Sequence, residues 1–71
     1  MFNRGKIKQL REKRNWSLAD VVYALSKKGH GRTRQTISNW ELGKTEPKAS
    51  DIANLAKAFG VSILAFFRGD I

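Results

Sequence analysis

Four polar side chains that could carry chemistry share one face of a helix predicted between residues 33 and 42. They are Arg34, Gln35, Ser38 and Asn39. An arginine guanidinium can donate two parallel hydrogen bonds to guanine O6 and N7, and a glutamine or asparagine amide can pair with adenine N6 and N7. Ile37 and Trp40 occupy the opposite, apolar face and would anchor the helix. The segment therefore combines the two features that a helix needs to contact base edges in a major groove, a polar face with hydrogen-bonding side chains and an apolar face that anchors it.

Catalysis and metal binding are not expected. The sequence has no cysteine, and His30 is its one histidine. The acids Asp20, Glu41 and Asp51 fall on different predicted helices at cap or structural positions, so no catalytic constellation forms. We expect no enzyme activity, metal, cofactor or small-molecule substrate.

The charge of the chain favours a polyanionic partner. Lysine and arginine number 14 against 6 acids, which gives a net charge of +8. Residues 1–48 hold twelve of the cations and four of the acids, and residues 27–34 hold four cations without an acid. Segregated charge of this kind is typical of nucleic-acid binding, although a role in solubility alone would also use basic residues.

Length and hydropathy limit the architecture. A chain of 71 residues suffices for one small domain, which we assign to residues 1–71. No apolar run approaches the roughly 18 residues that span a bilayer, and the first residues lack the apolar core of a secretion signal. A cytoplasmic protein with no membrane contact is expected.

Cap residues and apolar spacing predict two helices in the first part of the chain. Ile7 and Leu10 mark a short basic helix that ends near Asn15. Ser17 and Asp20 have the spacing of a capping box, and apolar residues at helical spacing follow through Leu25.

Three further helices are predicted after residue 32. The third begins at Thr33 and stops at Gly43, the fourth begins between Lys48 and Ser50 and stops at Gly60, and Ser62 caps a short fifth helix. Helical spacing places the aromatic residues in a core rather than on a stacking surface, namely Trp16, Trp40, Phe59, Phe66 and Phe67. The predicted class is all-α, with five short helices around one core.

An ordered set of motifs resembles one known family. The segments are Ile7-x-x-Leu10-Arg11, Ser17-x-x-x-Val21-Val22, Thr33-x-x-x-Ile37-Ser38-x-Trp40-Glu41-x-Gly43-Lys44-x-x-Pro47 and Leu55-Ala56-x-x-Phe59-Gly60-Val61-Ser62. Together they are similar to the phage Cro and lambda-repressor type of helix-turn-helix domain, the XRE family. The resemblance covers about residues 6–67.

The resemblance implies a compact five-helix domain that binds double-stranded DNA in a sequence-specific manner as a repressor-type regulator of transcription, usually as a homodimer. Its recognition helix would be Thr33 to Leu42, with base contacts from Arg34, Gln35, Ser38 and Asn39. Lys44 would contact phosphate, as would Thr33 at a helix N-terminus whose backbone N–H groups favour anions. Arg11 and Glu41 match a structural ion pair of the family. Leu64 stands where the family tends to be polar, so we expect a dimer contact there.

Two features depart from the family pattern. Leu18 replaces a polar residue, often glutamine, that contacts phosphate in the family. The connection between the second and third helices is about five residues longer than usual, and we expect it to lie beside the recognition helix. Our hypothesis is that Lys27, Lys28 and Arg32 hold phosphates there; the alternative is a tolerated insertion with solvated charges.

Two other functions stay open at this stage. One is a protein-interaction module of the same fold, such as an antitoxin or a coactivator piece, in which DNA contact is secondary. The other is a basic RNA-binding protein that recognises shape or backbone, which predicts little preference among duplex DNA sequences.

Overall fold

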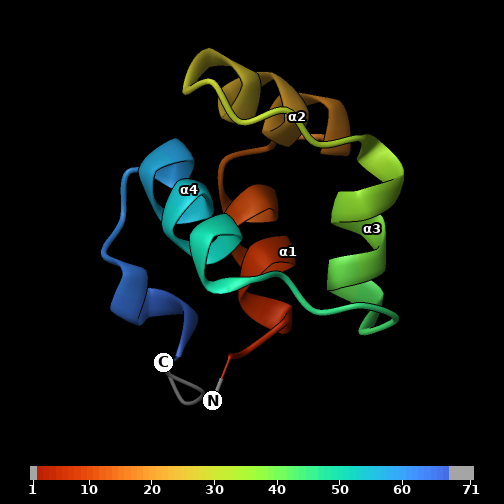
Figure 1. The fold of residues 1–71 in the computed structure, drawn as a ribbon, viewed down its shortest axis with the longest axis vertical. Helices are drawn as coiled ribbons and strands as arrows, with labels where there is room; N and C mark the ends of the chain where they lie inside the picture. The colour runs from red at the N-terminus through yellow and green to blue at the C-terminus, as the bar shows by residue number, and fades with distance from the viewer. Residues whose placement is uncertain (1, 68–71) are drawn as a thin grey trace.

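The computed structural model describes residues 2–67, and every regular element in this range is helical. The elements are α1 (Gly5–Lys13), α2 (Leu18–Lys27), α3 (Arg34–Leu42), α4 (Ala49–Phe59) and a 3-10 turn, η1 (Ile63–Phe66) (Figure 1). The all-α prediction is confirmed, but the expected fifth helix is wrong as an α-helix. Ser62 caps it by accepting a hydrogen bond from the Leu64 backbone N–H, yet only one turn forms before Phe67, and short turns of this length take the 3-10 pattern.

Each of the four α-helices in the described range ends in the same way. A residue with positive φ follows the last turn, and the next backbone N–H donates back into the helix. The positive-φ residues are Asn15, Gly29, Gly43 and Gly60. Asparagine tolerates this conformation and glycine adopts it without steric cost, so the stops predicted at Asn15, Gly43 and Gly60 are confirmed.

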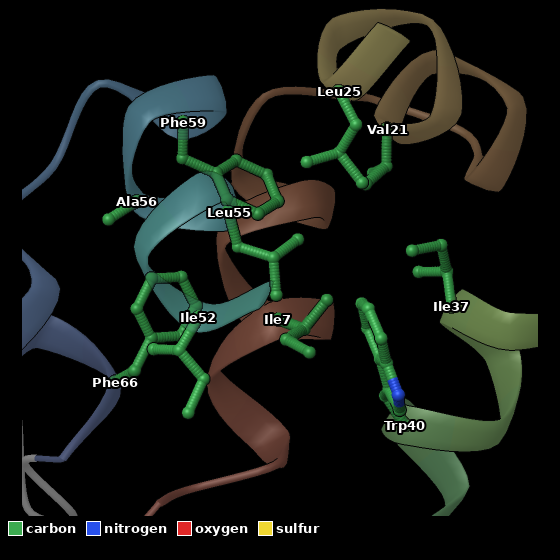
Figure 2. Packing of buried hydrophobic residues seen from close by; sticks show 10 residues of the cluster. All are labelled: Ile7, Val21, Leu25, Ile37, Trp40, Ile52, Leu55, Ala56, Phe59 and Phe66. Atoms are coloured by element: carbon green, nitrogen blue, oxygen red, sulfur yellow. The ribbon is translucent and has the colours of Figure 1, made fainter. Parts of the chain in front are cut away.

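The core lies where the helices converge (Figure 2). It consists of Ile7, Val21, Leu25, Ile37, Trp40, Ile52, Leu55, Ala56, Phe59 and Phe66. Trp16 packs at its edge, with its ring 5.4 Å from that of Phe59. Phe67 departs from the core prediction, since 41% of it is exposed. It follows the 3-10 turn outside the buried cluster, and its ring packs edge-on against Phe2 with the ring centroids 6.4 Å apart.

α2 and α3 form the predicted pair of helices, and the connection between them is longer than a tight turn. In Figure 1, α2 lies across one end of the molecule and α3 runs along its side. α2 extends to Lys27, and the chain from 28 to 33 then returns along α2 to the start of α3. The residues between α2 and α3 therefore supply this return path.

Candidate nucleic-acid interface

α3 is held by its apolar face and by caps at both ends. Ile37 is fully buried and Trp40 is 4% exposed, and both point into the core in Figure 2. At the first turn, the Thr33 hydroxyl accepts a hydrogen bond from the Thr36 backbone N–H at 3.1 Å. At the other end, Gly43 has φ 78° and stops the helix. This anchoring leaves the polar face turned away from the core.

The polar face of α3 is open to solvent. Arg34 and Gln35 are exposed, and Ser38 and Asn39 are half-buried. The Gln35 Nε2 donates to Asn39 Oδ1 at 3.0 Å, which orders two of the predicted reading residues against each other. One Nε2 hydrogen and the carbonyl oxygen of Gln35 stay available for a base edge. No acid lies in the first turn of α3, so the helix N-terminus favours an anion.

A shallow hollow lies on this face at the N-terminal end of α3. It is lined by Leu18, Thr33, Arg34, Gln35 and Ser38. The first residue of α2 therefore borders the same surface as three of the predicted reading residues. The N-terminal end of α2 therefore adjoins the polar face of α3, which we call the reading face.

Arg11 and Glu41 form the ion pair that the family resemblance implies. The Arg11 Nε and a terminal nitrogen donate to the two Glu41 carboxylate oxygens at 2.9 and 3.1 Å. The remaining guanidinium nitrogen donates to the Trp16 carbonyl at 3.1 Å. The side chains are 15% and 9% exposed, respectively. Hydrogen bonding to Glu41 raises the pKa of Arg11 above its ordinary value, so this guanidinium stays protonated where it ties α3 to α1.

A second ion pair, which the sequence did not indicate, joins the connection to α4. Arg32 donates from Nε and a terminal nitrogen to Asp51 Oδ1, at 3.1 and 2.7 Å. Asp51 is 7% exposed, and its other oxygen accepts the Lys48 backbone N–H at 3.1 Å. The third nitrogen of Arg32 donates to the Gly31 carbonyl. The arginine that we expected on phosphate thus has a protein partner, although 42% of its side chain is exposed.

Lys27 and Lys28 lie elsewhere than we expected. They line a groove with Lys57 and the C-terminal end of α4, whereas the hollow beside Arg34 is at the other end of α2. At 1.5 Å per residue, Leu18 and Lys27 are about 14 Å apart along the helix axis. Their position at the end of α2 places these lysines away from the hollow beside Arg34, so only the last part of the connection lies beside the recognition helix.

Helix ends explain the charges of that groove. α1, α2 and α4 all end there, and carbonyl groups at helix C-termini favour cations. Arg14 donates to the Phe59 carbonyl at 2.6 Å and so caps α4. The Lys27 ammonium lies 5.4 Å from the centre of the Tyr23 ring. Arg14 thus has a structural role at a helix end, and contact of Lys27 and Lys28 with phosphate stays a prediction.

Lys44 lies at the C-terminal end of α3. It is exposed and directly follows the left-handed Gly43, and its backbone N–H donates to the Asn39 carbonyl at 2.9 Å. Arg4 covers this stop: its guanidinium donates to the Leu42 carbonyl at 3.0 Å and lies over Gly43. This contact joins residues 38 positions apart and could not be predicted from local sequence patterns.

η1 carries the residue expected at a dimer contact. Leu64 is 58% exposed, beside Ile63 and Phe67, each 41% exposed. Leu42 at the end of α3 is also exposed, at 59%.

Within residues 2–67, no group of three potential ligand side chains could hold a metal ion. No helix in the same range is long and apolar enough to cross a bilayer.

An anchored helix with an open polar face, preceded by a second helix that packs against it, defines a helix-turn-helix domain. The family model described as Helix-turn-helix matches residues 7–66, most of the chain. The chain therefore belongs to the XRE family of helix-turn-helix proteins, the Cro and lambda-repressor type. This is a family of DNA-binding regulators of transcription rather than enzymes. Neither the curated proteins nor the solved structures contain a match to this chain.

Proposed function

We propose that this protein binds a specific double-stranded DNA sequence as a transcriptional repressor, with α3 in the major groove. The observation that supports this most directly is the two-sided burial of α3. Its apolar side is fixed in the core, while the other side presents an exposed Arg34 and an ordered Gln35–Asn39 pair. Side chains of these types discriminate base pairs in the major groove.

Base contacts in this proposal come from Arg34, Gln35, Ser38 and Asn39. Phosphate contacts come from the first turn of α3 at Thr33 and from Lys44, one at each end of the helix, and they fix its register on the duplex. Repression follows when the bound protein covers DNA that the polymerase needs.

The protein acts as a homodimer in this proposal, with Leu64 in the contact between protomers. An exposed leucine between two half-exposed apolar residues supports this placement. Two recognition helices would then lie about 34 Å apart, one turn of DNA. Sedimentation with and without DNA tests the contact: Leu64→Asp should abolish dimers, and retention of dimers would exclude this face.

Selection of bound duplexes from a random pool, at stated salt, tests the function. We expect a palindromic site, and Arg34→Ala should weaken its binding by about 1–3 kcal/mol and relax preference at one base position. If no sequence is enriched, the proposal fails, and the interaction-module or RNA-binding function takes its place. If a sequence is enriched but Arg34→Ala leaves every preference intact, the assignment of Arg34 is wrong.

A further inference from the structure

Leu18 has no role in the contacts proposed so far. It is the first residue of α2, half-buried, and packs partly against the core. It also lines the hollow on the reading face, where the other lining residues are Thr33, Arg34, Gln35 and Ser38. Leu18 is the one aliphatic hydrocarbon side chain among these five. It gives an otherwise polar hollow an apolar wall.

The polar members of this hollow match polar groups on base edges. Guanine and adenine offer hydrogen-bond acceptors and a donor in the major groove, and arginine or glutamine can satisfy them. A leucine side chain cannot form these hydrogen bonds, so it would contact a part of the base edge that carries no polar atom. Thymine supplies such a part, because its C5-methyl group projects into the major groove.

Thr33 strengthens the apolar character of the hollow. Its hydroxyl is engaged with the Thr36 backbone N–H at 3.1 Å and the Thr36 hydroxyl at 3.0 Å. Two of the three hydrogen-bonding sites of this hydroxyl are thus used within the protein, and Thr33 can also present its methyl group to a base. Two hydrocarbon surfaces, from α2 and from the cap of α3, border one hollow.

We propose that Leu18 contacts the C5-methyl group of a thymine at or next to the base pair that Arg34 contacts, and so determines specificity for thymine there. Bases along a strand are 3.4 Å apart, so side chains that share one hollow reach the same or adjacent base pairs. The inference rests on the proposed function. It assigns to Leu18 a base contact in place of the phosphate contact that a polar residue would make.

Deoxyuridine provides the test, because it differs from thymine only by the missing methyl group. In the selected duplex, each thymine is replaced in turn, and affinity is measured by fluorescence anisotropy at one salt concentration. We expect one position in each half-site where the wild-type protein loses about fourfold in affinity. A loss of this size corresponds to the free energy of burying one methylene-sized group. At that position, Leu18→Ala should bind the thymine and deoxyuridine duplexes equally.

Leu42→Ala is the matched control, since Leu42 is an exposed leucine on α3 outside the hollow. It should keep the fourfold ratio. A Leu18→Ala protein that binds both duplexes more weakly but retains that ratio would show that Leu18 only packs, and would overturn the inference.

The wild-type protein gives a result that does not depend on the folding of any variant. If no thymine-to-deoxyuridine replacement lowers its affinity by twofold or more, the methyl contact is excluded. That outcome leaves sequence-specific binding intact, whereas failure to select any duplex removes the proposed function together with this inference.

Discussion

Removal of Glu41 should destabilise the fold strongly, because it leaves a charged guanidinium buried without its partner. In the structure, Arg11 is 15% and Glu41 is 9% exposed at the side chain, and two hydrogen bonds of 2.9 and 3.1 Å join them. A pair this enclosed belongs with buried ion pairs, for which loss of one member costs roughly 3–5 kcal/mol. An exposed pair would contribute under about 1 kcal/mol.

The size of the protein makes this difference easy to measure. A domain of this length has a total stability of roughly 4–11 kcal/mol, and 1 kcal/mol shifts its melting temperature by about 4–8 °C. Thermal melting followed by circular dichroism should therefore show Glu41→Ala at least about 12 °C below wild type, or already unfolded. Glu46→Ala removes an exposed glutamate and should melt within a few degrees of wild type.

A double variant separates the charge from the packing. Arg11→Met with Glu41→Leu replaces both members by apolar side chains, and such replacements of buried pairs are often neutral or stabilising. We expect it to recover most of the stability lost in Glu41→Ala. A Glu41→Ala protein that melts within about 5 °C of wild type would refute the reasoning, since the pair would then behave as solvent-exposed.

Four further variants test the ends of the helices. Lys44→Ala should lower the salt dependence of DNA binding by about one counterion while base preference is kept, measured by titration at several salt concentrations. Joint replacement of Lys27 and Lys28 by alanine should lower that slope by about two counterions if both contact phosphate as predicted, and an unchanged slope would exclude that contact. Gly43→Ala and Gly60→Ala should each cost about 1 kcal/mol in chemical denaturation because both residues have positive φ. Gly43→Ala should cost more, since an added Cβ would displace the arginine packed over it, whereas Gly60 has open space.

Much of the fold could be predicted from local chemistry. Ser17 and Asp20 have the spacing of a capping box, and both of its hydrogen bonds are present. Gly43 and Gly60 mark helix ends because few other residues adopt positive φ there. Signals of this kind involve residues a few positions apart, so the sequence displays them directly. The burial of Ile37 and Trp40, which orients α3, follows from helical spacing in the same way.

Contacts between distant residues were the part that the sequence did not reveal. For Asp51 the sequence predicts only a cap or structural position, yet this residue also pairs with Arg32, 19 positions earlier. Likewise, a count of added residues does not say whether they lengthen a helix or a loop. In the structure α2 runs to Lys27, so Lys27 and Lys28 lie at the other end of this helix from the hollow beside Arg34.

The lengthened connection raises the question of what holds the start of α3, since a tight turn no longer does. The Arg32–Asp51 pair supplies an answer: the residue two positions before α3 is tied to a nearly buried carboxylate of α4. At the other end of α3, Glu41 is tied to α1. Both ends of the recognition helix are thus fixed by ion pairs to other helices, independently of the length of the connection.

This arrangement predicts that Arg32→Ala weakens specific DNA binding by loosening the start of α3, without changing the salt dependence. Asp51→Asn should have a similar effect, because it removes the charge that holds Arg32 but keeps an acceptor for the Lys48 backbone N–H. A phosphate contact by Arg32 predicts the opposite pattern: its replacement would lower the slope by about one counterion, and Asp51→Asn would free the guanidinium for DNA and leave the slope unchanged or steeper. Binding isotherms for both variants over a range of salt concentrations distinguish the two roles, because positioning acts on affinity alone and phosphate contact acts on the slope.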